Sequence, residues 1–233
     1  MNEYDSLKEK ISEIEQKIKY VFEDKELLLL SFVHRSFVNE NKKIIEIHNE
    51  RLEFLGDAIL NLVVSEYLFK KFPKATEGEL SFLRSQIVDS NSCMGYLRKL
   101  NLESYVLLGK GEKQTEDRGR DSILADLFEA VIGAVFLDGG FFKAKDFILN
   151  NFEDDFQIFL EKPTRNFKAE FQNFCQKKYL KLPNYKIIKE SGPDHSKVFE
   201  VGVYIDDTVL GIGMGPSKKE AEQAAAEKAL KNL

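Results

Sequence analysis

A cluster of acidic residues in the segment Asn49–Asp57 (NERLEFLGD) is the part of this sequence best suited to chemistry. At about 100° of rotation per helical residue, Glu50, Glu53 and Asp57 fall within about 60° of one another, on one face of a helix. The three acids are therefore predicted to project from a single helix. The opposite face is apolar and is predicted to be buried, and it carries Leu52, Leu55, Ile59, Leu62 and Val63.

A second acidic pair, Asp126 and Glu129, has the same helical spacing in the apolar segment ADLFEAV. Like charges three or four residues apart destabilise an isolated helix by roughly 0.2–0.5 kcal/mol, so something should compensate them. Mg²⁺ prefers oxygen ligands and keeps positions free for phosphate oxygens. The acids therefore indicate either a magnesium site that acts on a phosphate or solvated surface acids paired with Arg51 and neighbouring lysines.

The histidines and cysteines do not suggest other chemistry. The motifs H-E-x-x-H and E-x-x-H are missing, and His34, His48 and His195 lack ligand spacing, which disfavours a zinc protease or a histidine-containing di-iron site. Cys93 and Cys175 have no C-x-x-C partner and are predicted to be small buried hydrophobic residues. The nucleophile motif G-x-S-x-G is also missing.

Composition limits the class of protein. The chain has 233 residues, of which 43% are hydrophobic and 31% charged, enough for one large domain or two small ones and unlike a disordered or collagen-like chain. Two cysteines cannot supply a disulfide framework, which favours a reducing compartment. No apolar stretch approaches the ~20 residues of a membrane span, and the N-terminus lacks a signal core. We therefore expect a soluble cytoplasmic protein with no membrane partner.

The sequence pattern changes near residue 160. Before that point apolar residues recur at intervals of three and four, which predicts an all-α domain over residues 1–160. Residues 161–166 (EKPTRN) predict a linker, and residues 167–233 predict a small α+β domain of order α-β-β-β-α. The whole chain has a net charge of −5, but residues 163–233 have 12 Lys or Arg against 9 Asp or Glu. This split is compatible with a metal-using domain joined to one that binds a polyanion.

The expected elements follow from periodicity and capping signals. Helices are predicted after Asp24 and over residues 49–72, 76–99, 122–138 and 141–160, with a polar loop at 109–121 and a break at Gly139–Gly140. In the second domain we predict helices over 167–179 and from Ser217, and strands over 185–191, 197–205 and 208–214.

These motifs resemble those of the ribonuclease III family. Residues Asn49–Asp57 are identical to the family's signature, and Ser122–Glu129 (SILADLFE) resembles its second acidic motif. The α-β-β-β-α part is similar to the double-stranded-RNA-binding domain that follows the nuclease domain in bacterial members. The resemblance covers nearly the whole chain and implies an all-α nuclease domain followed by that small α+β domain.

The resemblance also implies an activity. Family members are endoribonucleases that hydrolyse phosphodiester bonds in double-stranded RNA, leaving 5′-phosphate and 3′-hydroxyl ends with short 3′ overhangs. The implied cofactor is Mg²⁺, with Mn²⁺ as a substitute, and the implied targets are ribosomal RNA precursors, some messenger RNAs and small RNAs. By similarity the metal ligands are Glu53, Asp126 and Glu129, and the catalytic acids are Asp57, Glu129, Glu50 and Glu77.

Individual roles and the oligomeric state also come from the resemblance. Asp57 is expected to work with Glu129 on the attacking water. Family members are homodimers, and Glu77 matches an acid that acts across the dimer interface. Phe54, Leu55 and Ile59 are candidates for that interface, although burial within one chain explains them equally well.

Three polar surfaces in the second domain suit duplex RNA, which is read by shape, 2′-hydroxyls and phosphates. The expected contact residues are Gln172 and Asn173 on the first helix, His195 in the loop Gly192–His195, and Ser217, Lys218 and Lys219 at the start of the last helix. The family commonly has a Thr and a Glu at the positions of Ala169 and Asn173, so contacts there are expected to be weaker or altered.

Two other functions compete with the nuclease. A non-catalytic double-stranded-RNA-binding protein of the same fold should have lost at least one acid, yet Glu53, Asp57, Asp126 and Glu129 are all present. A helical metal-dependent pyrophosphohydrolase would explain the acids but not the second domain.

Overall fold

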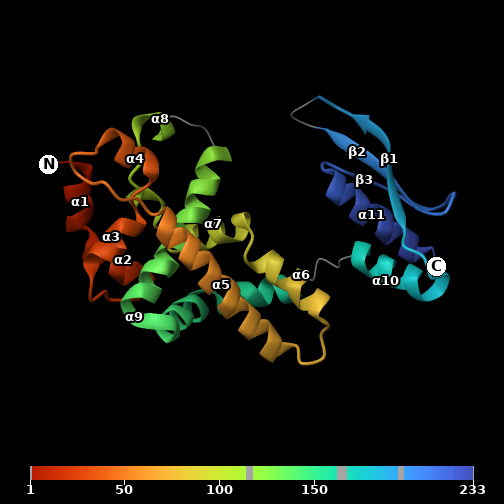
Figure 1. Cartoon of the computed structure of the whole chain (residues 1–233), viewed down its shortest axis with the longest axis horizontal. Coiled ribbons are helices and arrows are strands. Elements are labelled where there is room, and N and C mark those ends of the chain that lie inside the picture. Colours follow the sequence, from red (N-terminus) through yellow and green to blue (C-terminus); the bar gives the residue numbers. More distant parts are fainter. Residues whose placement is uncertain (1, 114–117, 162–166, 194–196, 233) are drawn as a thin grey trace. The chain divides into compact units, whose positions relative to one another are not determined.

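The computed structural model describes residues 2–113, 118–161, 167–193 and 197–232. The chain divides into two compact units, residues 1–163 and 164–233, the first helical and the second a sheet with two helices (Figure 1). This confirms the predicted fold class. Except for Glu161, the predicted linker 161–166 lies outside the described residues.

The first unit contains helices of very different length. They are α1 (Glu3–Glu9), α2 (Ile11–Ile18), α3 (Lys25–Ser31), α4 (Arg35–Glu40), α5 (Glu50–Lys71), α6 (Glu77–Ile87), α7 (Ser90–Lys99), α8 (Lys110–Lys113) and α9 (Arg118–Glu161), with a 3-10 turn at Glu103–Tyr105.

Two predicted boundaries in this unit were wrong. The single helix expected over 76–99 is two helices, because Asp89 has extended backbone and its side chain accepts a hydrogen bond from Ser92 N at 2.8 Å, capping α7. The expected loop at 109–121 contains α8 and the start of α9, and its residues 114–117 lie outside the described part. The predicted break at Gly139–Gly140 is confirmed, since α9 kinks at Gly140, whose φ is 76°.

Helices α5 and α9 form the centre of the first unit, and α7 packs against α9. The ring of Tyr96 lies 5.4 Å from that of Phe128 and 4.9 Å from that of Phe152, so an aromatic cluster joins α7 to both halves of α9. The buried face of α5 includes Leu52, Ile59, Leu60, Val63 and Val64.

The burial predicted for Leu62 was wrong, because 52% of that residue is exposed. On the helical wheel Leu62 lies at the edge of the predicted apolar stripe, about 60° from the buried Ile59 and about 20° from Phe69. Phe69 is 70% exposed. The apolar stripe of α5 is therefore wider than the part of this helix that the rest of the first unit buries.

The second unit is an antiparallel sheet of order β1-β2-β3, with α11 packed against β2 and β3 and α10 packed against α11. Its elements are α10 (Phe167–Tyr179), β1 (Asn184–Ser191), β2 (Val198–Ile205), β3 (Thr208–Gly215) and α11 (Lys218–Lys231). A Cβ on Gly213 would lie 2.1 Å from Ala225 N, and one on Gly211 2.4 Å from Ala225 O. Glycines on β3 and alanines on α11 thus let helix and sheet approach closely.

Among the residues that the structure describes, none of the helices combines the length and the low charge that a membrane span requires.

Candidate functional site

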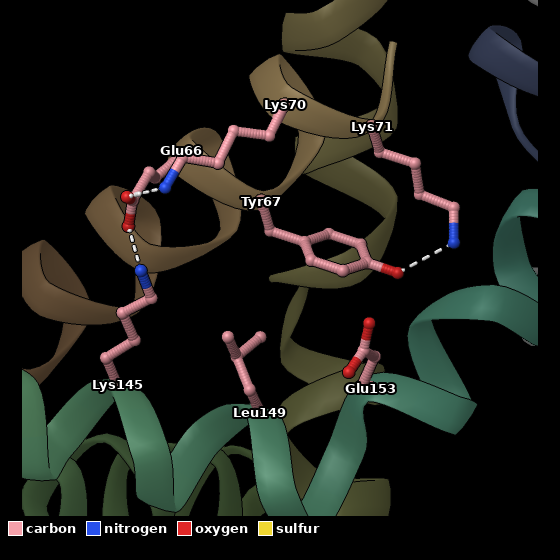
Figure 2. A pocket seen from close by; sticks show the side chains of 7 residues that line it. All are labelled: Glu66, Tyr67, Lys70, Lys71, Lys145, Leu149 and Glu153. Carbon is pink, nitrogen blue, oxygen red and sulfur yellow. Dashed lines mark hydrogen bonds and ion pairs between the residues drawn. The ribbon is translucent and has the colours of Figure 1, made fainter.

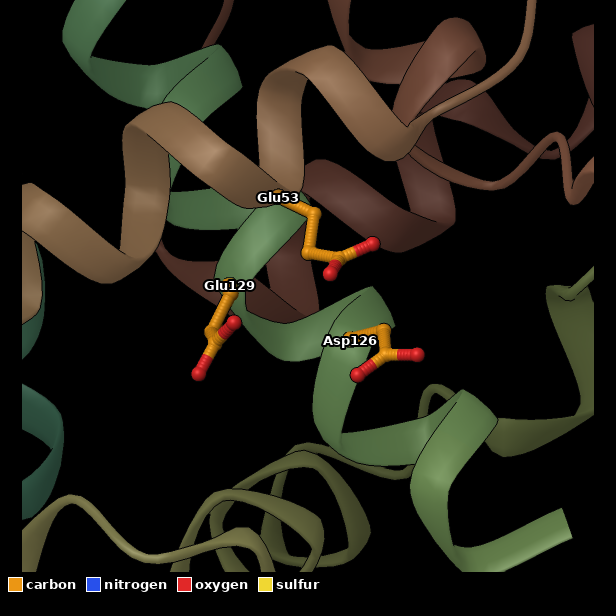
Figure 3. Close-up of side chains that lie close together, drawn as sticks. All are labelled: Glu53, Asp126 and Glu129. Carbon is orange, nitrogen blue, oxygen red and sulfur yellow. The ribbon is translucent and has the colours of Figure 1, made fainter. Parts of the chain in front are cut away.

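Three carboxylates from two distant parts of the chain meet in the first unit. Each of Glu53 on α5 and Asp126 and Glu129 on α9 offers an oxygen, and these oxygens lie within 4.8 Å of one another. Figure 3 shows Glu53 on α5 close to Asp126 and Glu129 on α9. Mg²⁺ takes oxygens at about 2.0–2.1 Å in an octahedral shell, so neighbouring ligand oxygens lie roughly 3 Å apart and opposite ones about 4 Å. Small side-chain movements would bring these three oxygens onto one cation.

Two glycines make this meeting of helices possible. A Cβ on Gly56 would lie 1.7 Å from Glu129 O, and a Cβ on Gly133 would lie 2.2 Å from Leu52 O. Each glycine therefore faces the backbone of the other helix directly beside one of the acids. Because no side chain separates the two backbones, Glu53 and Glu129 come close enough to share a ligand.

The start of α5 is fixed by a residue whose role sequence reasoning missed. Asn49 is 2% exposed, its Nδ2 donates to Ser31 O at 3.0 Å, and its backbone N donates to Val33 O at 2.9 Å. Asn49 thus ties the first turn of α5, which carries Glu50 and Glu53, to the end of α3. An asparagine just before an apolar helix suggests a capping residue, but its side chain makes no cap bond here.

The carboxylates disfavour ionisation of one another. Burial, followed by the charges of Asp57, Asp126 and Glu53, raises the pKa of Glu129 to about 8. Burial and then neighbouring acids, Asp126 first, raise the pKa of Glu53, and burial followed by Glu50 raises that of Asp126. The group therefore favours either bound protons or a bound cation.

Within the described ranges only one of these acids has an ion pair. Glu50 lies 3.3 Å from the Arg35 guanidinium and 3.7 Å from His48 Nδ1, the latter an ion pair only when the imidazole is protonated. The same part of the chain places no lysine or arginine, Arg51 included, in an ion pair with the other four acids. Among the described residues, the alternative that these acids form ordinary surface ion pairs therefore finds no partner cation for Glu53, Asp57, Asp126 or Glu129.

The remaining predicted catalytic acids do not join the group. Asp57 is exposed and accepts a hydrogen bond from Asn61 Nδ2 at 2.7 Å, while its charge acts on Glu129. Glu50 lies at the edge, where its charge acts on Asp126. Glu77 is exposed on the first turn of α6 and accepts from Ser81 Oγ at 3.1 Å. Of the five acids that the two sequence clusters contain, three converge.

The metal-free protein should lose stability at this site as the pH rises from about 5 to about 8. The pKa of Glu129 is about 8 in the folded protein and has its ordinary value of 4.5 in the unfolded chain, so between these values the folded state holds a proton that the unfolded state has released. Raising the pH then favours unfolding. The melting temperature of the wild type in EDTA should fall further over this range than that of Glu129→Gln, and a divalent cation should remove the difference. An equal fall in both proteins would contradict the assignment.

Cys93 also lies beside this group. It is buried, as predicted, and its Sγ is 4.0 Å from Glu129 Oε1. Nothing in the sequence links position 93 to position 129, so this contact could not be predicted.

A separate pocket of about 310 Å³ lies between α5 and the second half of α9 (Figure 2). Glu66 accepts hydrogen bonds there from Lys70 and Lys145, and Lys71 Nζ donates to Tyr67 OH at 2.9 Å. The pocket contains none of the predicted site residues. The Glu66–Lys145 ion pair joins the C-terminal part of α5 to α9 and so supports the packing of the two helices.

The second unit displays most of the polar residues predicted from its sequence. Gln172 and Asn173 are exposed on α10. Ser217 caps α11, because its Oγ accepts from Glu220 N at 3.2 Å. His195 lies outside the described residues.

The two lysines that follow Ser217 differ in their surroundings. Lys218 Nζ lies 3.8 Å from Glu190 on β1 and 5.6 Å from the centre of the Phe199 ring. Lys219 is exposed. The start of α11 therefore presents two ammonium groups beside free backbone N–H groups, an arrangement that suits a phosphate.

Comparisons with known proteins match both units. A Ribonuclease-III-like family model matches residues 24–155, and a model of the double-stranded RNA binding motif matches residues 167–233. Ribonuclease 3 of Protochlamydia amoebophila (strain UWE25) is 56% identical over 220 residues, which are 94% of this chain and 90% of that protein. Ribonuclease 3 of Borreliella burgdorferi is 42% identical over 227 residues, 97% and 92% of the two chains.

A solved structure resembles the first unit. The nuclease domain of ribonuclease III from Campylobacter jejuni matches with a TM-score of 0.58 and 43% identity. The match covers 63% of this chain and 99% of that chain, and the structure is described as having flexibility in a region involved in dimer formation.

Proposed function

This chain belongs to the ribonuclease III family, and on that premise we propose that Glu53, Asp126 and Glu129 hold Mg²⁺ for hydrolysis of phosphodiester bonds in double-stranded RNA. The convergence of these three carboxylates, with no cation paired to them among the described residues, is the observation that carries the proposal. When bound, Mg²⁺ supplies positive charge against the phosphate and lowers the pKa of a nearby water. Mn²⁺, which also takes oxygen ligands, is proposed as a substitute.

The protein's residues orient the reaction. Water attacks phosphorus, the bond from phosphorus to the 3′ oxygen breaks, and the products carry a 5′-phosphate and a 3′-hydroxyl. Asp57 lies one turn beyond Glu53 with its carboxylate held by Asn61, so it is proposed to accept the proton of the attacking water with Glu129. Glu50, held by Arg35, is proposed as a supporting acid at the edge of the site.

The two parts of the chain divide the work. Residues 1–160 are proposed as the nuclease domain, 161–166 as the linker and 167–233 as the RNA-binding domain. Ribosomal RNA precursors, some messenger RNAs and small RNAs are the proposed substrates, and the cytoplasm is the proposed location.

A cleavage assay tests the function. A duplex RNA of ~30 base pairs, long enough for the ~16 base pairs that such a binding domain spans, is incubated with the full chain in Mg²⁺ or in EDTA. We expect cleavage in Mg²⁺ only, with 5′-phosphate ends. Binding without cleavage in Mg²⁺ would instead favour the non-catalytic RNA-binding alternative.

The proposed contact of RNA with the start of α11 predicts how duplex binding depends on salt concentration. Changing both Lys218 and Lys219 to alanine should weaken duplex binding and reduce the slope of log affinity against log salt by roughly one unit per lost phosphate contact. The matched control changes Lys228 and Lys231, exposed on the same helix but near its other end, and removes the same charge. If both double variants change the slope equally, the effect is one of net charge and the assigned contact is wrong.

A dimer is proposed from the exposed apolar face of α5. Phe54 is 80% exposed, Leu62 52% and Phe69 70%, and they fall within about 80° on the helix. Ile59, predicted as an interface candidate, is buried within the chain, and Leu55 packs partly against its core. We propose that a second copy covers this face and that Glu77, outside its own chain's carboxylate group, acts across the interface.

Changing Phe54 to aspartate should dissociate that dimer. A charge introduced at an aromatic contact of this face is expected to raise the dimer dissociation constant at least 30-fold, which is ~2 kcal/mol. Sedimentation equilibrium of the wild type and the variant measures this. Phe142→Asp is the control, because Phe142 on α9 is 77% exposed but lies outside the α5 face. A dimer equally stable in Phe54→Asp would place the interface elsewhere.

A further inference from the structure

We infer that Cys93 is a positioning residue for Glu129: its buried side chain forms a wall that directs the Glu129 carboxylate toward Glu53 and Asp126. This inference rests on the proposed magnesium site. Cys93 lies on α7, outside both acidic segments, and is 0% exposed. It acts through Glu129 and does not itself touch the RNA or the metal in this proposal.

The contact depends on the size of sulfur more than on hydrogen bonding. Cys93 Sγ lies 4.0 Å from Glu129 Oε1 and 3.7 Å from Val88 O. A thiol has one proton and is a weak donor, so it cannot satisfy both oxygens and holds neither strongly. What the side chain supplies is a buried, weakly polar sulfur atom in contact with the carboxylate.

Helix α7 holds this wall firmly in place. Tyr96, one turn after Cys93, packs against Phe128, and its hydroxyl donates to Ile87 O at 3.0 Å. The start of α7 is capped by Asp89, and Ser92 Oγ donates to Gln86 O at 2.9 Å. Cys93 therefore cannot withdraw from Glu129 without disturbing the aromatic cluster and the turn that precedes α7.

The backbone of Glu129 is fixed from the opposite side. Its carbonyl oxygen lies where a Cβ on Gly56 would be, 1.7 Å from that ideal position, so α5 blocks a shift of α9 in that direction. The backbone of Glu129 is thus held against α5 and its side chain lies against Cys93, while one of its carboxylate oxygens lies within 4.8 Å of those offered by Glu53 and Asp126. Such support of a ligand by its neighbours is a usual way to raise metal affinity.

The chemistry of a thiol suits this position. The side chain is buried and, as a thiol, behaves as a small hydrophobic group that adds no charge to the cluster. A soft sulfur ligand also does not compete with carboxylate oxygens for Mg²⁺. A serine here would be smaller, and its hydroxyl would be a stronger hydrogen-bond donor beside Val88 O and Glu129 Oε1.

Magnesium binding without RNA tests the inference. Isothermal titration calorimetry of the full chain should show at least roughly tenfold weaker Mg²⁺ binding for Cys93→Ala and Cys93→Ser, as for loss of other residues that support a ligand. Cys93→Val, which keeps an apolar wall, should bind Mg²⁺ nearly as the wild type does. Cleavage at saturating duplex should follow the same order at low Mg²⁺, while the KM for RNA stays unchanged.

Two controls separate positioning from loss of stability. Leu97 is also 0% exposed and lies one turn further along α7, so Leu97→Ala should lower the melting temperature without weakening Mg²⁺ binding. Cys175 is equally buried but lies in the other unit, and Cys175→Ala should leave Mg²⁺ binding unchanged.

The inference is overturned if Cys93→Ala binds Mg²⁺ as the wild type does, if Leu97→Ala weakens binding equally, or if Cys93→Ser retains binding that Cys93→Val loses. The last result would assign the role to hydrogen bonding. A wild type that neither binds Mg²⁺ nor cuts RNA would instead refute the proposed function.

Discussion

Glu129→Gln should reduce RNA cleavage at saturating Mg²⁺ roughly a thousandfold or more while leaving duplex binding almost unchanged. Glutamine keeps the size of the side chain but removes its negative charge. Of the three acids that converge, Glu129 has the pKa that is raised most, to about 8. Losing one charged ligand removes several kcal/mol of transition-state stabilisation, and ~4 kcal/mol corresponds to about a thousandfold in rate. Duplex affinity should persist because the proposed RNA contacts lie in the other unit.

The matched control for this experiment is Glu153→Gln. Glu153 lies on the same helix but lines the separate pocket between α5 and α9, so the same chemical change occurs away from the carboxylate group. Single-turnover cleavage and filter binding of one ~30-base-pair duplex measure both quantities for the three proteins. Equal cleavage by Glu129→Gln and the wild type would remove Glu129 from the site, and loss of cleavage in Glu153→Gln would show a general effect of α9.

Gly56→Ala should both destabilise the protein and impair cleavage. The new methyl group would lie 1.7 Å from Glu129 O and 2.6 Å from its carbonyl carbon, so α5 and α9 must move apart. Overpacking of this kind costs about 3 kcal/mol, more than the ~1 kcal/mol that alanine gains over glycine in a helix. The net loss of ~2 kcal/mol should lower the melting temperature of a unit of this size by roughly 4–8 °C. Separation of Glu53 from Glu129 should also weaken Mg²⁺ binding.

Gly95→Ala is the control, because Gly95 is also helical but a Cβ there meets nothing within 4 Å. It should leave cleavage unchanged and raise stability by up to ~1 kcal/mol. Differential scanning calorimetry with a Mg²⁺ titration distinguishes the two variants. If Gly56→Ala melts and cuts like Gly95→Ala, the close approach of the two helices is not required for the site.

Local patterns predicted much of the fold. The order α-β-β-β-α, the helix that carries Glu53 and the kink at Gly140 followed from periodicity and glycine alone. Boundaries that depend on a single side chain were harder to predict, because the separate start of α7 depends on the cap that the Asp89 side chain provides. The exposure of Leu62 could not be predicted, because it depends on how much surface the neighbouring helices cover.

The sequence by itself determined which acids share a helical face and, through its motifs, the family to which they belong. Helical spacing and motif identity are properties of short stretches of chain, so one segment is enough to reveal them. Only the tertiary structure decided that Glu53 meets Asp126 and Glu129, that Asp57 and Glu77 do not join them, and that Cys93 lies behind Glu129. These contacts depend on the packing of α5, α7 and α9, where Gly56 and Gly133 remove the side chains that would keep two backbones apart.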